Sequence, residues 1–198
     1  MSGRDLLMFA QALVRSPREV GAIAPSSALL AERLATVVPR RRDAVVVELG
    51  AGTGAVTAKI DQRRSPESTF LVFERNPRLA EQLTRLAPTA HVADDARDLR
   101  TQLANSGCAG ADAIVCGLPW AIFSAQEHDE LLSAITDVLA PGGVFTTFAY
   151  VHALVLPQAR RFRDELTARF DEVLPTRAVL RNLPPAITYV CRSPRQAR

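Results

Sequence analysis

Apolar residues along this chain form short runs that alternate with longer segments in which they recur every three or four positions. Short runs rich in β-branched and aromatic residues are typical of strands buried on both faces of a sheet, and the periodic segments are typical of amphipathic helices. The runs predict strands at 44–49, 69–74, 89–93, 111–116, 143–150, 172–180 and 186–191. The periodic segments predict helices at 3–15, 27–37, 53–63, 77–86, 96–104, 125–139 and from Pro157 to about Phe170.

The order of these elements indicates the fold class. Five strand–helix units precede two final strands, which would close as a hairpin, and this alternation favours an α/β fold with a mostly parallel sheet and helices on both faces. Ser124 and Glu127 have the spacing of a capping box, and Pro141-Gly-Gly143 predicts the end of the helix that they begin. No repeat, linker or low-complexity tract divides the chain, so we expect one domain over residues 1–198.

The first predicted strand ends in Glu48 and is followed by glycine at positions 50, 52 and 54. Glycines allow a tight turn and a close approach of backbone N–H groups to a ligand, and Thr53 can cap the following helix. The dinucleotide fingerprint is Gly-x-Gly-x-x-Gly, whereas an acid at the strand end would repel phosphate and suit a cationic ligand. The sequence resembles motif I of the class I S-adenosylmethionine (SAM) methyltransferases, although a bare turn is the alternative.

Acidic residues also follow the second and third predicted strands. Glu74 ends the second strand, where a carboxylate can accept two hydrogen bonds from ribose hydroxyls of a ligand on the glycine loop. Asp95 follows the third strand, and in the methyltransferase fold an acid there holds the adenine amino group. The alternatives are a solvated Glu74 and an Asp95 that caps helix 96–104.

The fourth strand leads into Gly117-Leu118-Pro119-Trp120, where this fold places the group to be methylated. Adenine-N6 methyltransferases carry Asn/Asp-Pro-Pro-Tyr or Asn-Leu-Pro-Tyr here, and the amide grips a flat aromatic amine. Gly117 lacks that amide, while Trp120 keeps an aromatic wall, which suits an aliphatic amine held by a cation–π contact. A plain turn with a core tryptophan is the alternative.

Composition narrows the class of protein. Three scattered cysteines and three histidines indicate neither a disulfide framework nor a metal site, and no apolar stretch reaches the length of a membrane span. No signal peptide is evident, so we expect a cytoplasmic protein. The net charge is +3, and arginines cluster at 40–42, 63–64, 160–163 and in the C-terminal tail. These clusters are compatible with anionic lipid or nucleic acid, or with ordinary solvated surfaces.

The whole chain resembles the bacterial phospholipid N-methyltransferases, which are relatives of the rRNA adenine dimethylases. The segments that carry this resemblance are Pro17–Ser27, Val47–Gly54, Gly117–Pro119, Gly143–Tyr150 and Arg181–Ala186. The resemblance implies a Rossmann-like, seven-stranded sheet with an antiparallel last strand. It also implies methyl transfer from SAM to phosphatidylethanolamine, or to its monomethyl and dimethyl forms, at the membrane surface. An rRNA adenine N6-methyltransferase, a small-molecule amine methyltransferase and a non-catalytic SAM-binding protein are the alternatives.

The same resemblance implies the site residues. The cofactor residues would be Glu48, Gly50, Ala51, Gly52, Thr53, Gly54, Glu74, Arg75, Asp95, Ala96, Gly117 and Ser26. The substrate residues would be Leu118, Pro119, Trp120, Arg181 and Asn182, the last two holding a lipid phosphate. Tyr150 could orient the amine and His152 could accept its proton, although a core aromatic and a surface loop histidine are the plain interpretations.

The predicted helix 3–15 offers a physical link to lipid. Arg4, Gln11 and Arg15 fall on one narrow stripe beside a wide apolar face. Such a helix would lie in an anionic headgroup layer at the inner face of the cell membrane, or it would simply dock on the sheet. Nucleic acid is disfavoured as a partner because no helical RNA-binding domain follows the last strand, and the oligomeric state stays open.

Overall fold

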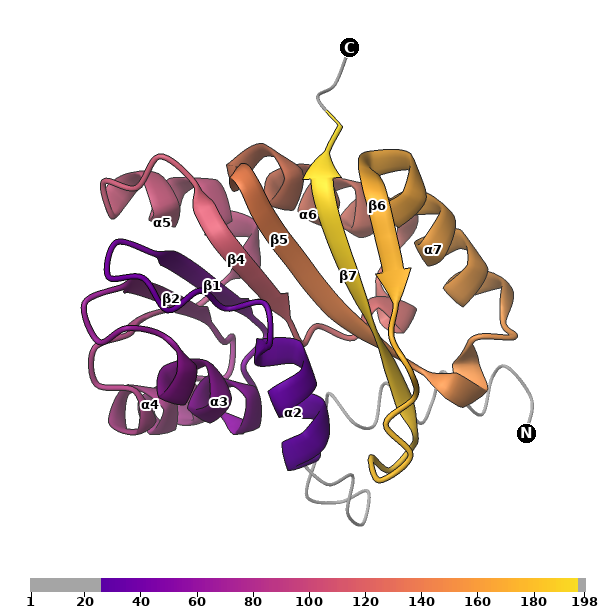
Figure 1. Ribbon diagram of the computed structural model, residues 1–198, viewed down its shortest axis with the longest axis horizontal. Coiled ribbons are helices and arrows are strands. Elements are labelled where there is room, and N and C mark those ends of the chain that lie inside the picture. The colour runs from indigo at the N-terminus through magenta and orange to yellow at the C-terminus, as the bar shows by residue number, and fades with distance from the viewer. Residues whose placement is uncertain (1–25, 196–198) are drawn as a thin grey trace.

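The computed structural model describes residues 26–195, in which a single seven-stranded sheet lies between two layers of helices (Figure 1). The strand order is β3-β2-β1-β4-β5-β7-β6. The strands are β1 (Val45–Leu49), β2 (Thr69–Phe73), β3 (His91–Ala93), β4 (Ala111–Cys116), β5 (Leu139–Tyr150), β6 (Phe170–Pro175) and β7 (Ala186–Pro194). All neighbouring pairs are parallel except those of β7, which runs antiparallel to both β5 and β6. The predicted Rossmann-like methyltransferase fold, with its antiparallel last strand, is confirmed.

Helices cover both faces of the sheet. One face carries α2 (Ala28–Ala35), α3 (Ala55–Arg63) and α4 (Pro77–Leu86), and the other carries α5 (Leu99–Asn105), α6 (Ala125–Val138) and α7 (Pro157–Arg169) (Figure 1). Short 3₁₀ helices η1 (Ala96–Asp98), η2 (Trp120–Ile122) and η3 (Val151–Ala153) follow β3, β4 and β5. The predicted helix 3–15 and both ends of the predicted 1–198 domain lie outside the described residues.

Two separate hydrophobic cores result from the alternation of strand side chains. Val46 and Val72 pack under α2, α3 and α4, whereas Val47 and Phe73 pack under α5, α6 and α7. Strands that are apolar at successive positions therefore bury both of their faces, as a parallel sheet between helices requires.

Two predicted boundaries were wrong. Helix α6 begins with the predicted Ser124–Glu127 capping box and ends at Val138, one residue before its predicted end, but the strand predicted at 143–150 begins earlier, at Leu139. Strand β5 starts at once, because Leu139 pairs with Ala111, and the chain then loops out before pairing resumes at Val144. The predicted strand 172–180 is instead β6, which ends at Pro175, and residues 176–185 form an irregular loop before β7.

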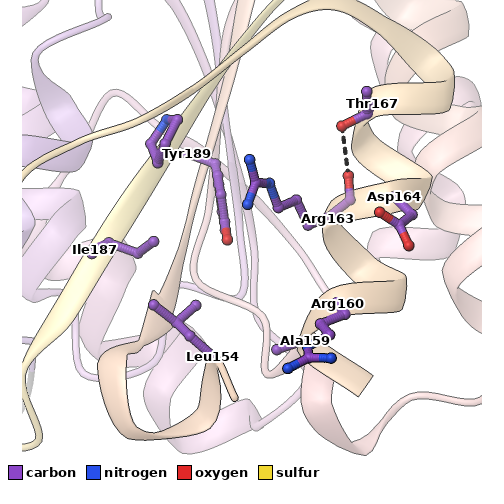
Figure 2. Close-up of a pocket in the computed structure, with 9 residues that line it drawn as sticks. Leu154, Ala159, Arg160, Arg163, Asp164, Thr167, Ile187 and Tyr189 are labelled. Carbon is purple, nitrogen blue, oxygen red and sulfur yellow. Dashed lines mark hydrogen bonds between the residues drawn. The ribbon is translucent and has the colours of Figure 1, made fainter. Parts of the chain in front are cut away.

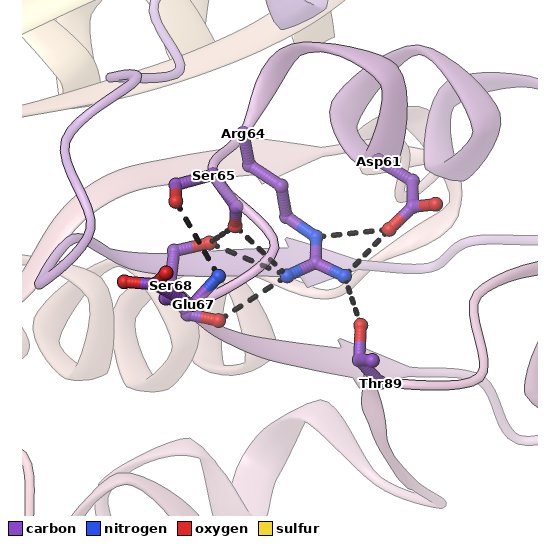
Figure 3. A network of polar contacts seen from close by, with 6 residues as sticks. All are labelled: Asp61, Arg64, Ser65, Glu67, Ser68 and Thr89. Carbon is purple, nitrogen blue, oxygen red and sulfur yellow. Dashed lines mark hydrogen bonds and ion pairs between the residues drawn. The ribbon is translucent and has the colours of Figure 1, made fainter.

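A buried arginine ties together elements at the amino edge of the sheet. Arg64, at the end of α3, is 5% exposed, and its guanidinium donates to Asp61, to the backbone oxygen of Ser68 and to Thr89 (Figure 3). Five donors in a fixed fork make arginine suited to such a multiple role. The prediction that Arg64 belongs to a basic surface cluster was therefore wrong for this residue.

Candidate functional site

The glycine loop lies at the carboxyl edge of the sheet, between β1 and α3. Gly50, Gly52 and Gly54 have φ of 74°, 56° and 86°, the left-handed region that residues with a side chain rarely adopt. The loop is anchored because the N–H of Gly50 donates to the backbone oxygen of Phe73 at the end of β2, at 2.9 Å. Gly54 itself is the N-cap residue of α3, and Thr53 points outward and is exposed. The predicted capping role of Thr53 is therefore wrong.

A second loop, which follows β4, packs directly on the glycine loop. The Gly117 N–H donates to the backbone oxygen of Leu49 at 2.8 Å. A Cβ on Gly117 would lie 2.7 Å from the Gly50 oxygen, and a Cβ on Gly50 would lie 2.6 Å from the Leu118 side chain. A Cβ on Gly52 would meet no atom within 4 Å. The two loops thus need glycine for their mutual contact, while the space beside Gly52 stays open to a ligand.

Glu74 joins the glycine loop to the end of β2. One carboxylate oxygen accepts the Gly52 N–H at 2.8 Å, and the other accepts the Asn76 N–H at 2.8 Å. Each carboxylate oxygen has two acceptor positions, so the side chain retains capacity for the hydroxyls of a ligand. The structure thus brings Glu74 beside the loop, as the ribose-binding role requires.

Glu48 is fully buried under the same loop. Burial raises the pKa of its carboxyl group to about 8, and the nearby Glu74 carboxylate adds to the rise, while Thr57 partly opposes it. Oε2 of Glu48 and Oγ1 of Thr57 have no hydrogen-bond partner among the described residues. Glu48 is therefore largely protonated at neutral pH in the cofactor-free protein. A cation bound nearby would favour its ionised form.

Asp95 follows β3 and is occupied by a local ion pair. Its carboxylate caps η1 by accepting the Arg97 N–H at 3.0 Å, so the capping interpretation is confirmed. It also accepts from Arg97 Nε at 3.1 Å, and this arginine, with a smaller contribution from the charge of Arg75, lowers the pKa of Asp95. Ala96 is buried at the start of η1. A contact of Asp95 with adenine would have to compete with Arg97, whose side chain is 68% exposed.

Trp120 belongs to the core. It is 6% exposed, its ring stacks on Phe162 with centroids 4.6 Å apart, and its Nε1 donates to Thr147 Oγ1 at 2.9 Å. This geometry does not support the predicted aromatic wall for a substrate amine. It matches the alternative, a plain turn with a core tryptophan. Leu118 and Pro119 remain half-buried at the carboxyl end of β4, beside the glycine loop.

A buried histidine that sequence analysis missed holds the turn that ends in Trp120. His128 Nε2 lies 2.7 Å from the Trp120 backbone oxygen, and Nδ1 lies 2.8 Å from a carboxylate oxygen of Glu165. A backbone oxygen can only accept, so Nε2 carries a proton. The two helices α6 and α7 supply His128 and Glu165, which are 37 positions apart. No local spacing could have indicated the pair.

Tyr150 and His152 lie together at the end of β5. Their rings stack with centroids 5.7 Å apart. Burial raises the pKa of the Tyr150 hydroxyl, so this group is a neutral hydrogen-bond donor at neutral pH, whereas His152 is exposed. The structure thus brings the two predicted catalytic residues to the same edge as the glycine loop.

The 176–185 loop gives Arg181 and Asn182 different surroundings. Arg181 is exposed, but Asn182 is buried, and its amide accepts the Ser27 N–H at 2.9 Å and donates to the Pro184 oxygen at 2.7 Å. This engagement argues against the predicted phosphate contact for Asn182 and indicates that it fixes the loop to the start of α2. The half-buried Ser26 is held next to this junction, since Ser27 caps α2.

Taken together, the carboxyl edge fits a nucleoside cofactor with a cationic tail and no phosphate. It offers open space at Gly52, acceptor oxygens on Glu74 and an unpartnered buried oxygen on Glu48. Within residues 26–195, no group of three or more metal-ligating side chains comes together. No helix in the described range is long and apolar enough to cross a bilayer.

Comparisons with known proteins agree with this geometry. Residues 46–143 match the family model described as a methyltransferase domain. The chain is 34% identical to the ornithine lipid N-methyltransferase of Singulisphaera acidiphila over 98% of its own length and 99% of the relative's.

Solved structures share the fold at low sequence identity. One is the O-methyltransferase TomG from Streptomyces achromogenes in complex with SAM, with a TM-score of 0.67 and 20% identity over 93% of this chain and 88% of that one. Another is an rRNA methylase from Streptococcus thermophilus, with a TM-score of 0.59 and 15% identity over 87% of this chain and 99% of that one. The chain therefore belongs to the class I SAM-dependent methyltransferases, in the same family as the Singulisphaera ornithine lipid N-methyltransferase.

Proposed function

We propose that this enzyme methylates the primary amine of a lipid headgroup, with ornithine lipid as the first candidate acceptor and phosphatidylethanolamine as the second. The observation that carries the proposal is the 34% identity, over nearly the full length of both chains, to an ornithine lipid N-methyltransferase. Phosphatidylethanolamine was the acceptor expected from sequence alone. Both lipids present an aliphatic primary amine at a membrane surface, so the chemistry asked of the site is the same.

The geometry around Gly117 supports an aliphatic amine over adenine. An asparagine amide at this position would grip a flat aromatic amine, but any side chain there would start from a Cβ only 2.7 Å from the Gly50 oxygen. The close packing of the two loops thus excludes the amide grip without a shift of backbone. This is a physical argument against the rRNA adenine alternative.

The cofactor residues that we propose are those gathered at the carboxyl edge. Gly50–Gly54 would carry the cofactor against their backbone, Glu74 would accept the ribose hydroxyls, and Glu48 would balance the ammonium group. Asp95 would reach the adenine amine after releasing Arg97. The bound cofactor supplies an electrophilic methyl group on a sulfonium.

The residues of this chain would hold the neutral amine in place and accept the proton that it loses on methylation. The Tyr150 hydroxyl, kept protonated by burial, would orient the amine. His152, stacked on that ring and exposed to solvent, would accept the proton. Leu118 and Pro119 would exclude water from the amine.

The test is methyl transfer from labelled SAM by the purified full chain to four separate acceptors. These are ornithine lipid in vesicles, phosphatidylethanolamine in vesicles, free ornithine, and rRNA fragments. We expect label in the lipid arms, strongest with ornithine lipid, and separation by thin-layer chromatography reports the number of methyl groups. Label only in free ornithine would replace the proposal by a small-molecule activity, and label only in RNA would overturn it in favour of the adenine alternative.

A further inference from the structure

Exposed apolar side chains gather at one place on the described surface. Of the seven exposed large apolar residues in the described chain, five lie within residues 151–155 and 174–183. Val155 is 71% exposed, Leu180 73% and Leu183 71%. Exposed apolar residues are unremarkable singly, but a concentration of them marks an interaction surface.

The two segments form one surface at the carboxyl edge of the sheet. The Val151 N–H donates to the Pro185 backbone oxygen at 2.8 Å, which joins η3 to the end of the 176–185 loop. Figure 1 shows this loop extending past the end of β6, on the side of the molecule where β5 also ends. We call the surface of residues 151–163 and 174–185 the edge rim.

The two segments of the edge rim are basic, although Asp164 and Glu165 directly follow the first of them on α7. They contain five arginines and no aspartate or glutamate, namely Arg160, Arg161, Arg163, Arg177 and Arg181. None of the five makes an ion pair with another described residue. Outside the rim, Arg85 and Arg100 are exposed and paired with carboxylates, whereas Arg40, Arg75 and Arg78 are exposed without an ion pair to another described residue but do not cluster with exposed apolar side chains. Unpaired arginines beside exposed apolar side chains match an anionic lipid surface in both charge and hydrophobicity.

A cavity of about 700 Å³ opens in the rim between α7 and the β6–β7 pair. Figure 2 shows the Arg163 side chain extending from α7 toward the Tyr189 side chain of β7, with Arg160 nearer the start of α7. Leu154 and Ile187 supply apolar wall, and Asp164 is the one acid that lines it. Two guanidinium groups and a hydroxyl can hold an anionic headgroup while the apolar wall contacts its chain.

We infer that the edge rim docks on an anionic bilayer and that the cavity holds the headgroup of an anionic lipid. The glycine loop and Gly117 lie at the same edge of the sheet. Docking in this orientation faces the methyl-transfer site toward the amines of the membrane surface. The inference deepens the proposed function, because it says how a lipid amine is presented to the site.

Vesicle sedimentation of the full chain without cofactor tests the inference. The probes are vesicles of phosphatidylcholine with about one third phosphatidylglycerol, vesicles of pure phosphatidylcholine, and inorganic phosphate as a competitor. We expect binding to the anionic vesicles only, weakened by salt and not displaced by phosphate at concentrations of a few millimolar. The variants R160Q/R163Q and V155S/L180S should each lose about tenfold or more in binding.

The matched control is R42Q/R85Q, which removes two exposed arginines remote from the rim. All variants should keep SAM binding and the wild-type melting temperature, because the altered side chains are exposed. If the control variant loses as much vesicle binding as the rim variants, the net charge of the protein and not the rim determines binding, and the inference is overturned. Unchanged vesicle binding of both rim variants would also overturn it. If inorganic phosphate displaces the protein from anionic vesicles, the cavity binds a soluble anion and not a lipid headgroup. Since binding is measured without catalysis, its outcome is independent of whether lipid is methylated.

Discussion

At the residue scale, burial and close packing restrict which side chains can occupy key positions of the site. Glu48 is 1% exposed, and a Cβ on Gly117 would lie 2.7 Å from the Gly50 oxygen. Glu48 lies within β1 and Gly117 directly follows β4, and both strands bury both of their faces, so the sheet fixes the backbone there. Single substitutions at these positions therefore separate electrostatic from steric contributions to the site.

Glu48 makes the stability of the cofactor-free protein depend on pH. Its folded pKa of about 8 lies above the ordinary value of 4.5, so between these values the folded state binds more protons than the unfolded state. The free energy of unfolding should fall as pH rises through this range, by an amount on the order of a few kcal/mol. Glu48→Gln should flatten that dependence in thermal denaturation measured from about pH 5 to 8. An unchanged slope in the variant would show that Glu48 ionises freely in the folded protein.

Gly117→Ala tests the contact between the two loops. The added Cβ would meet the Gly50 oxygen at 2.7 Å, so the loops must separate, and overpacking of this kind costs about 1–3 kcal/mol. We expect SAM affinity in calorimetry to fall by roughly tenfold or more. Gly107→Ala is the control, because Gly107 precedes β4 at the opposite end of the strands from the site, and a Cβ there would meet no atom within 4 Å. Normal SAM binding by the Gly117 variant would contradict the account of this position.

At the element scale, helices are held to the sheet and to each other by buried polar contacts as well as by the two apolar cores. Arg64 connects the end of α3 to the start of β2 and to the segment before β3. His128 connects α6 to α7 and to the turn after β4. Each of these groups satisfies several partners, so its removal leaves more than one buried polar atom without a hydrogen bond.

Arg64→Met should destabilise the fold far more than loss of an exposed arginine does. It strips Asp61, Ser68 and Thr89 of their shared partner, and breaking a buried charged contact costs about 3 kcal/mol or more. Arg85→Met, which loses only an exposed pair with Glu81, should cost less than about 1 kcal/mol. Chemical denaturation of the two variants makes the comparison. Similar losses for both would mean that the Arg64 contacts contribute little.

The His128–Glu165 contact should appear as a coupling energy. A double-mutant cycle of His128→Gln and Glu165→Gln, followed by chemical denaturation, should give a coupling energy of about 1–3 kcal/mol, because the His128 side chain is 10% exposed and that of Glu165 is 29% exposed. The pair also supports the turn that contains Leu118, so His128→Gln should weaken SAM binding, whereas the exposed Asp137→Asn on the same helix should not. A coupling energy near zero would show that the contact between the two side chains does not stabilise the fold.

At the scale of the whole molecule, the fold was predictable because its main signals are local. The apolar runs of β1, β2 and β4 and the Ser124–Glu127 capping box specify their elements through neighbouring residues alone. The start of β5 was missed because the pairing of Leu139 with Ala111, a long-range contact, outweighs the Pro-Gly-Gly signal that follows it.

The site was predictable only in part, for the same reason. The glycines, Glu48 and Glu74 stand at strand ends, and parallel topology alone brings strand ends together. Trp120 is placed by its stacking on Phe162, and Asn182 by its hydrogen bond with Ser27. Both partners are distant in the sequence, so the spacing of residues could not predict these contacts. Thr53 was misassigned as the cap because glycine in the left-handed conformation took the N-cap position itself.

The measurement that tests the central claim most directly is mass spectrometry of ornithine lipid incubated in anionic vesicles with SAM and the purified chain. The account predicts lipid products heavier by one or more methyl groups with the wild-type protein. It predicts little product with Gly117→Ala and near wild-type product with Gly107→Ala. A wild-type protein that binds SAM yet leaves ornithine lipid and phosphatidylethanolamine unmodified would contradict the assignment of a lipid amine to this site.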